Sequence, residues 1–191
     1  MGAAQSMSSE SFWKNKIMAL REIGENDLEL MLRWRNHPSV RSSMFSQSVI
    51  ELEKHKLWFE REFEKSDSEW LIFLDEGNTP RGVMYFTEMN RVSRNAFWGF
   101  YTAPDAPPGT GTKMGREALI YYFNDLGFHK LNADVLESNE RSYYFHLKLG
   151  FNVEGVFRDQ YMGTEGYESV TRFALIEGAN SGSGLKVCIN E

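Results

Sequence analysis

Apolar residues recur at helical spacing in two segments near the start of the chain. In the first segment, an apolar stripe begins after Asn26-Asp27 and ends at His37-Pro38. In the second, Ser48 and Glu51 have the spacing of a capping box, in which two side chains satisfy free N–H groups at a helix start, and another apolar stripe follows. The pattern predicts one helix in each segment.

From Trp70 onward the pattern changes to short runs of aromatic and β-branched residues, which are typical of strands. Three runs, 70–74, 83–87 and 95–101, are separated by turn residues and predict an antiparallel meander. The later elements are expected to be a helix that ends at Gly127, a strand at 131–136, a helix at 140–149 and a hairpin of 153–157 with 169–176. The predicted order is β-α-α-β-β-β-α-β-α-β-β.

Length and composition fit one soluble domain. The chain has 191 residues, of which 41% are hydrophobic and 14% aromatic, enough to fill a core. We expect a disordered leader at 1–16, a domain at 17–177 and a Gly/Ser-rich tail at 178–191. The one cysteine, Cys188, excludes an intramolecular disulfide and a cysteine-based zinc site. No apolar run is long enough to span a membrane, and we expect a cytoplasmic protein.

The net charge argues against nucleic acid as a partner. Lys and Arg total 21 against 27 Asp and Glu, which gives −6. One glycine-rich segment, Gly109 to Gly115, still attracts anions, because it leads into a helix start whose free N–H groups favour a pyrophosphate. Lys113 and Arg116 are placed to reach the same charges. The spacing matches neither GxGxxG nor GxxxxGK[ST], so a plain glycine-rich loop stays open as an alternative.

A second motif follows one strand after the glycine-rich segment. Asn139, Ser142, Gly150 and Phe151 match the pattern Asn-x-x-Ala/Ser-x-x-x-Tyr-x-x-x-Gly-Phe, and with it the chain resembles the GNAT family of N-acetyltransferases over about 17–176. The resemblance implies an α+β fold, a three-layer α/β/α arrangement with a mixed, centrally splayed seven-stranded sheet. It also implies acetyl-CoA as co-substrate and no metal.

The same resemblance implies which residues bind the donor. In the family, the glycine-rich segment grips the pyrophosphate of acetyl-CoA, and the fourth strand receives the acetyl carbonyl and the pantetheine amides. The implied residues are Phe100, Tyr101, Thr102, Gly109, Thr110, Gly111, Thr112, Lys113, Met114, Gly115, Asn139, Ser142 and Tyr143. The chain departs from the family pattern at Pro108 and Lys113, although Lys113 is a candidate to replace the lost cationic contact.

Catalytic roles follow from side-chain chemistry within this frame. His146 stands where relatives carry the Tyr that protonates the leaving thiolate, and a protonated imidazole suits that role; Tyr143 and Tyr144 are the alternative acids. Asp134 is the favoured base, because apolar neighbours would make it a better proton acceptor near neutrality, with Glu137 and Glu88 as rivals. Structural roles for both His146 and Asp134 stay open.

The acceptor side is predicted from the segment 33–45, the basic part of an acidic chain. Arg35 shares the apolar helix face, so its guanidinium needs either a protein partner or a phosphate of the acceptor. The segment and the glycine-rich motif resemble one branch of the family, the N-acetyltransferases of pseudaminic acid biosynthesis. The implied substrate residues are Arg33, Trp34, Arg35, Arg41, Met44, Phe45, Trp58, Glu88 and Trp98.

The resemblance implies direct attack by the 4-amino group of a UDP-amino-sugar, UDP-4-amino-4,6-dideoxy-N-acetyl-β-L-altrosamine, on the thioester of acetyl-CoA. Arginines would serve the diphosphate, and an apolar pocket would serve the methyl group. Two alternatives remain: acetylation of protein N-termini, as in the ribosomal-protein acetyltransferases, and a CoA-binding module without turnover. A homodimer is compatible with the sequence.

Overall fold

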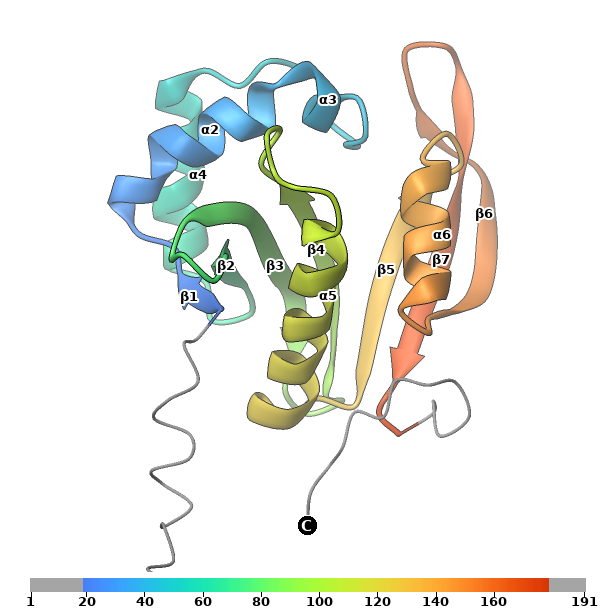
Figure 1. Cartoon of the computed structure of the whole chain (residues 1–191). Helices are drawn as coiled ribbons and strands as arrows, with labels where there is room; N and C mark the ends of the chain where they lie inside the picture. Colours follow the sequence, from blue (N-terminus) through green and yellow to red (C-terminus); the bar gives the residue numbers. More distant parts are fainter. Residues whose placement is uncertain (1–18, 179–191) are drawn as a thin grey trace, which may run out of the picture.

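The computed structural model describes residues 19–178. The predicted leader and Cys188 lie outside this range, as does the predicted tail apart from Gly178. One mixed sheet forms the centre of the molecule, with helices on both of its faces (Figure 1). No helix in this range is long and apolar enough to cross a membrane.

The elements follow the predicted order, with a short 3₁₀ turn and a short helix added near the start and a π-helical turn added after α5. They are β1 (Leu20–Glu22), η1 (Glu25–Asp27), α2 (Leu28–Asn36), α3 (Pro38–Arg41), α4 (Leu52–Phe63), β2 (Glu69–Leu74), β3 (Pro80–Asn90), β4 (Asn95–Thr102), α5 (Thr110–Ile120), η2 (Tyr121–Asp125), β5 (Lys130–Leu136), α6 (Glu140–Lys148), β6 (Asn152–Met162) and β7 (Tyr167–Ile176).

The sheet splits at its centre. Its strand order is β1-β2-β3-β4-β5-β7-β6, and β4 with β5 is its one parallel pair. These two strands pair only between 95–97 and 130–132, and beyond Phe97 they separate. Because every second backbone group of a strand points to one neighbour, the rest of β4 presents N–H and C=O groups to the gap. The predicted seven-stranded, centrally splayed α+β fold is confirmed.

Each face of the sheet carries its own hydrophobic core. One core joins the sheet to α5 and α6 and includes Met114, Leu149 and Phe173. The other joins it to α2 and α4 and includes Met31 and Phe59. The two cores bury the apolar stripes that the sequence shows, which is why these segments are helical.

Two predicted helix starts differ from the structure. Helix α4 begins at Leu52 with Glu51 at its N-cap, so Ser48 lies outside it and the predicted capping box is wrong. The glycine-rich segment is mostly helical, because α5 already begins at Thr110. Only Gly109 keeps a conformation that favours glycine, with φ of 89°. Thr110, Met114 and Gly115 are buried within the first turns of α5, so residues 110–115 are packed as part of the helix and form no open loop.

Candidate active site

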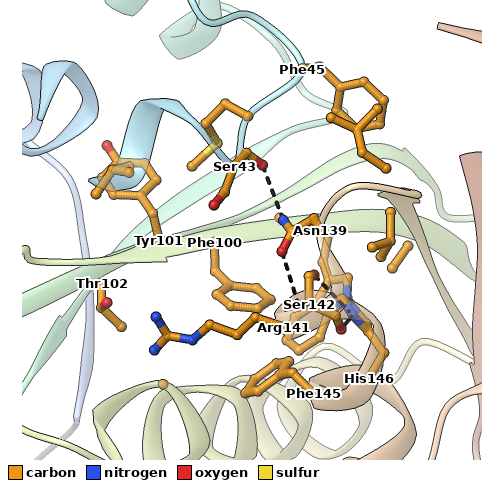
Figure 2. Close-up of a pocket in the computed structure, with 18 of the residues that line it drawn as sticks. Ser43, Phe45, Phe100, Tyr101, Thr102, Asn139, Arg141, Ser142, Phe145 and His146 are labelled. Carbon is orange, nitrogen blue, oxygen red and sulfur yellow. Dashed lines mark hydrogen bonds between the residues drawn. The ribbon is translucent and has the colours of Figure 1, made fainter. Parts of the chain in front are cut away.

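A cavity of about 480 Å³ lies where β4 and β5 separate (Figure 2). Residues of β4, β5, α6 and the segment 39–45 line it. We name the side toward α5 and α6 the donor side and the side toward α2 and α3 the acceptor side, after the ligands that the sequence predicts there. The lining residues predicted from sequence are Asp134, His146, Phe100, Tyr101, Thr102, Gly111, Asn139, Ser142, Met44, Phe45 and Trp98.

The donor side combines backbone groups with one cation. Gly111, in the first turn of α5, lies on the cavity wall together with Thr102 of β4. Arg141 of α6 lines the same region, and its guanidinium points toward Thr102 (Figure 2). A helix N-terminus and a guanidinium are both suited to a phosphate group. Sequence reasoning missed Arg141, although it stands two residues after the motif residue Asn139.

Asn139 connects the two sides of the cavity. Its side-chain oxygen caps α6 by accepting from Ser142 N at 3.1 Å, and its Nδ2 donates to the Ser43 carbonyl at 3.2 Å (Figure 2). A second connection lies nearby, where the Tyr161 hydroxyl of β6 donates to the Phe45 carbonyl. The segment 42–46 is thereby attached both to α6 and to the β6–β7 hairpin.

His146 is a neutral core residue, which corrects the expectation that it is protonated near neutral pH. Its Nδ1–H donates to the Ser142 carbonyl at 2.7 Å, and its Nε2 accepts from Trp98 Nε1 at 3.2 Å. The side chain is 3% exposed, and burial lowers its pKa to about 4. An imidazole in this state has no spare proton to give to a leaving thiolate. The alternative acids Tyr143 and Tyr144 are not placed for this role either, since neither of them lines the cavity.

Asp134 lines the cavity, but its surroundings differ from the apolar ones expected. Both carboxylate oxygens accept from Arg172 of β7, with Nη2 to Oδ2 at 2.9 Å. The rival Glu137 is exposed and accepts weakly from Ser169 N at 3.4 Å. Glu88 is exposed at a bulge of β3. Of these three carboxylates, Asp134 is the one that reaches the cavity wall.

Arg35 is a half-buried cation without a carboxylate partner among the described residues. Its Nη2 donates to the Ser46 carbonyl at 2.6 Å, and its Nη1 is buried without a hydrogen-bond partner in this range. Burial lowers the pKa of Arg35, whereas the Tyr101 and Tyr85 hydroxyls raise it and Arg41 lowers it further. The guanidinium therefore lies close to two tyrosines that line the cavity.

The position of the Tyr85 ring requires a glycine at position 99 in the neighbouring strand β4. An added Cβ at Gly99 would lie 2.2 Å from the Tyr85 ring and hydroxyl, so the ring lies directly across the β4 backbone. Burial raises the pKa of Tyr85 and of Tyr101. Both phenols are therefore neutral hydrogen-bonding groups on the acceptor side of the cavity. Tyr85 was not predicted, because only the strand register pairs it with Gly99.

The remaining predicted residues are not among those that line the cavity. Met114 and Trp34 belong to the two cores, and Trp58 stacks on His55. Lys113 pairs with the exposed Glu76 at 3.1 Å instead of facing the cavity. The predicted residues outside the lining are Glu137, Gly109, Thr110, Thr112, Lys113, Met114, Gly115, Tyr143, Arg33, Trp34, Arg35, Arg41, Trp58 and Glu88. Trp98 lines the cavity from the donor-side core and is unavailable for stacking on a base.

The described residues hold no group of three or more His, Cys, Asp or Glu side chains that could bind a metal ion. The observed geometry instead suits a long thioester: a split sheet with free backbone groups, a helix N-terminus and a cation at one end of a single cavity. This arrangement is compatible with an acyltransferase that uses a CoA thioester.

Comparison with known sequences identifies the family. The sequence model of the acetyltransferase (GNAT) domain matches residues 18–152, and the chain belongs to this family. It is therefore an acetyl-CoA-dependent N-acetyltransferase, and the family supports acetyl-CoA and an amine as its substrates.

Two differently named groups of acetyltransferases match the chain about equally well. Acetyltransferase PseH of Campylobacter jejuni is 26% identical over 147 residues, which cover 76% of this chain and 90% of that protein. Spermidine N(1)-acetyltransferase of Escherichia coli is 25% identical over 162 residues, 83% of this chain and 85% of that protein. The crystal structure of spermidine N-acetyltransferase from Vibrio cholerae with CoA and spermine has a TM-score of 0.75 at 21% identity, over 82% of this chain and 94% of that one. Similarity alone thus leaves the acceptor open.

Proposed function

We propose that the acceptor is the 4-amino group of a UDP-amino-sugar, as in pseudaminic acid biosynthesis, the route to a sugar of bacterial flagellins. The observation that carries this proposal is Arg35. Its guanidinium is half-buried close to two tyrosines that line the cavity, and its Nη1 has no hydrogen-bond partner among the described residues, so a bound anion within its reach would stabilise it. Arg41 adds a second positive charge close to it. A sugar nucleotide brings a diphosphate that would complete this arrangement.

The charges of the cavity disfavour a polyamine. Asp134 is the only carboxylate among the lining residues that the structure describes, and Arg172 neutralises it. Spermidine carries several positive charges, which would need carboxylates in the wall and would be repelled by Arg35. A neutral or anionic amine has no such cost.

The apolar part of the acceptor wall fits a deoxy sugar. Val40, Met44 and Phe45 line the cavity beside Ser39 and Ser43. Such a wall offers contact for a methyl group and hydroxyls for a sugar ring. A branch of the family that acts on a 4,6-dideoxy sugar would need both.

The donor is proposed to lie in the gap between β4 and β5. The pantetheine amides would pair with the free backbone groups of β4, and the pyrophosphate would lie at the start of α5 near Arg141. Backbone N–H groups of β4 would stabilise the thioester oxygen as negative charge develops on it. This placement brings the thioester to the side of the cavity where Asp134 lies.

The transfer itself is a direct displacement. The neutral amine nitrogen attacks the thioester carbon, the C–N bond forms and the C–S bond breaks. The nitrogen loses one proton, and the CoA thiolate takes up one proton. His146 is given no part in these proton transfers, because both of its ring nitrogens are engaged in the core.

A panel of acceptors tests the proposal. Thiol release from acetyl-CoA would be followed with a UDP-4-amino sugar, spermidine and an N-terminal peptide, each over a range of concentrations. We expect the highest kcat/KM with the UDP-amino-sugar, and we expect UDP alone to compete with it. Preference for spermidine or for the peptide would overturn the proposed acceptor. Calorimetric binding of acetyl-CoA without thiol release in any assay would support a binding module instead.

A further inference from the structure

Four neighbouring strands contribute one side chain each to a row across the sheet. Asp134 of β5 and Arg172 of β7 are direct cross-strand partners and form a two-pronged ion pair. The Arg172 guanidinium lies 4.5 Å from the ring centroid of Phe97 on β4 and 5.2 Å from that of Phe157 on β6. Contacts with two aromatic rings and a carboxylate leave the guanidinium little freedom to rotate.

The row ends at the point where the sheet splits. Phe97 and Asn132 are the last paired residues of β4 and β5, and Asp134 is the next residue of β5 on the same face as Asn132. Asp134 lines the cavity there, whereas Arg172 does not. The guanidinium therefore holds the carboxylate through hydrogen bonds without itself lining the cavity.

We propose that Arg172 is a positioning residue of the acetyl transfer, which holds the Asp134 carboxylate at the split so that it accepts a hydrogen bond from the acceptor amine. A carboxylate offers about four lone pairs, and a two-pronged arginine occupies two of them. The two that remain are available to an N–H group in the cavity. This inference rests on the proposed function, in which the amine enters the cavity beside Asp134.

The oriented carboxylate would direct the attack. An amine that donates one N–H bond to a fixed acceptor has its lone pair aimed in one direction, and near-attack geometry of this kind accounts for a large part of enzymatic rates. The proton that the nitrogen loses passes along this bond toward Asp134 and from there to water, while the CoA thiolate takes up a proton. Without Arg172, the Asp134 side chain is free to rotate away from the amine.

Other acidic groups hold Arg172 in its charged form but do not replace Asp134. Glu88 of β3 and Glu154 of β6 both raise the pKa of Arg172, after the larger effect of Asp134 itself. Glu154 accepts from Lys130 at 2.7 Å. Neither glutamate lines the cavity, so Asp134 is the carboxylate through which Arg172 acts on the amine.

The test is a double-mutant cycle on the full-length protein, with whichever amine the wild type acetylates fastest. We expect Asp134→Asn to lower kcat about 100-fold and Arg172→Leu about 20-fold. The double variant should be no slower than Asp134→Asn alone, because Arg172 acts through Asp134. The KM for acetyl-CoA should stay unchanged in all three variants, and Arg172→Lys should restore part of the lost rate.

Arg21→Leu provides the matched control. Arg21 also forms a two-pronged pair with an aspartate, Asp27, at 2.7 Å for both bonds, but it lies on the edge strand β1 and does not line the cavity. This variant should lose stability without losing kcat. A folded Arg172→Leu protein with wild-type or higher kcat would overturn the positioning role, as would strictly additive effects in the cycle. Unchanged kcat in Asp134→Asn would instead refute the placement of the amine at Asp134.

Discussion

The two sides of the cavity are built from different material. The donor side consists of backbone groups at the split in the sheet and of a neutral, closely packed core around His146. The acceptor side consists of side chains from separate segments, among them Met44, Phe45 and Tyr85, and Arg35 lies close to Tyr85 and Tyr101 without lining the cavity itself. The form of the donor side is therefore set by the backbone, whereas substitutions on the acceptor side change the side chains that an acceptor would meet.

The largest expected effect tests whether the donor-side core is neutral. The pKa of His146 is about 4 in the folded protein, against about 6.5 when unfolded. The unfolded chain therefore binds more protons between these values, so stability present above pH 6.5 is lost as the pH falls to 4, by about 3 kcal/mol.

Urea unfolding of the wild type and of His146→Gln across pH 4–7 measures this loss. His55, whose pKa burial also lowers, remains in both proteins and cancels in the comparison. In a plot of unfolding free energy against pH, the variant should have a shallower slope than the wild type, by the amount that His146 contributes. Equal slopes would mean that His146 is charged in the folded protein and would reopen its role as an acid.

The second prediction concerns the charge of the acceptor side. Arg35→Ala should raise the KM for a UDP-amino-sugar about 30-fold, because a charge-assisted hydrogen bond to phosphate is lost. The KM for acetyl-CoA should not change. Arg33→Ala, in which an exposed arginine of the same helix is removed, is the control. Equal effects of the two substitutions would indicate general charge attraction instead of a specific contact.

The third prediction tests the shape of the acceptor side. Gly99→Ala should displace Tyr85, because the new Cβ would lie 2.2 Å from its ring, and kcat/KM for the amine should fall about 10-fold. Gly155→Ala, where an added Cβ meets nothing within 4 Å, should leave kcat/KM unchanged. Steady-state kinetics of the Gly99→Ala and Gly155→Ala variants measures this difference in kcat/KM. An unaffected Gly99→Ala enzyme would show that Tyr85 does not contact the acceptor.

The smallest expected effect belongs to the donor side. Arg141→Ala should weaken acetyl-CoA binding about 5-fold, because Arg141 is exposed and, in the proposed donor site, backbone groups would do most of the binding. Calorimetry at two salt concentrations measures this effect, which should shrink at high salt. Lys148→Ala, which removes an exposed cation at the other end of α6, should bind acetyl-CoA normally. A loss above 100-fold would contradict the backbone-dominated donor side.

Local signals accounted for much of the fold. Gly127 and Gly150 end their helical segments with positive φ, and Asn139 caps α6, as their positions in the sequence indicated. Helix α4 begins later than the capping box predicts, because the Asn36 side chain bonds both the N–H and the C=O of Ile50 and holds the chain outside the helix there. The glycine-rich segment is helical and not an open loop, because glycines are also tolerated in a helix that packs closely, as at Gly115 against Phe145 and Leu149.

The sequence by itself determined the order of the elements and the family, because caps, turns, motifs and apolar periodicity involve residues close together in the chain. Only the tertiary structure decided the state of the reactive groups. His146 is neutral because Trp98 and a carbonyl enclose it, Asp134 is paired because strand register places Arg172 opposite it, and Arg35 lacks a carboxylate because none of the described ones reaches it. Burial and register join residues far apart in sequence, and these contacts set the charges.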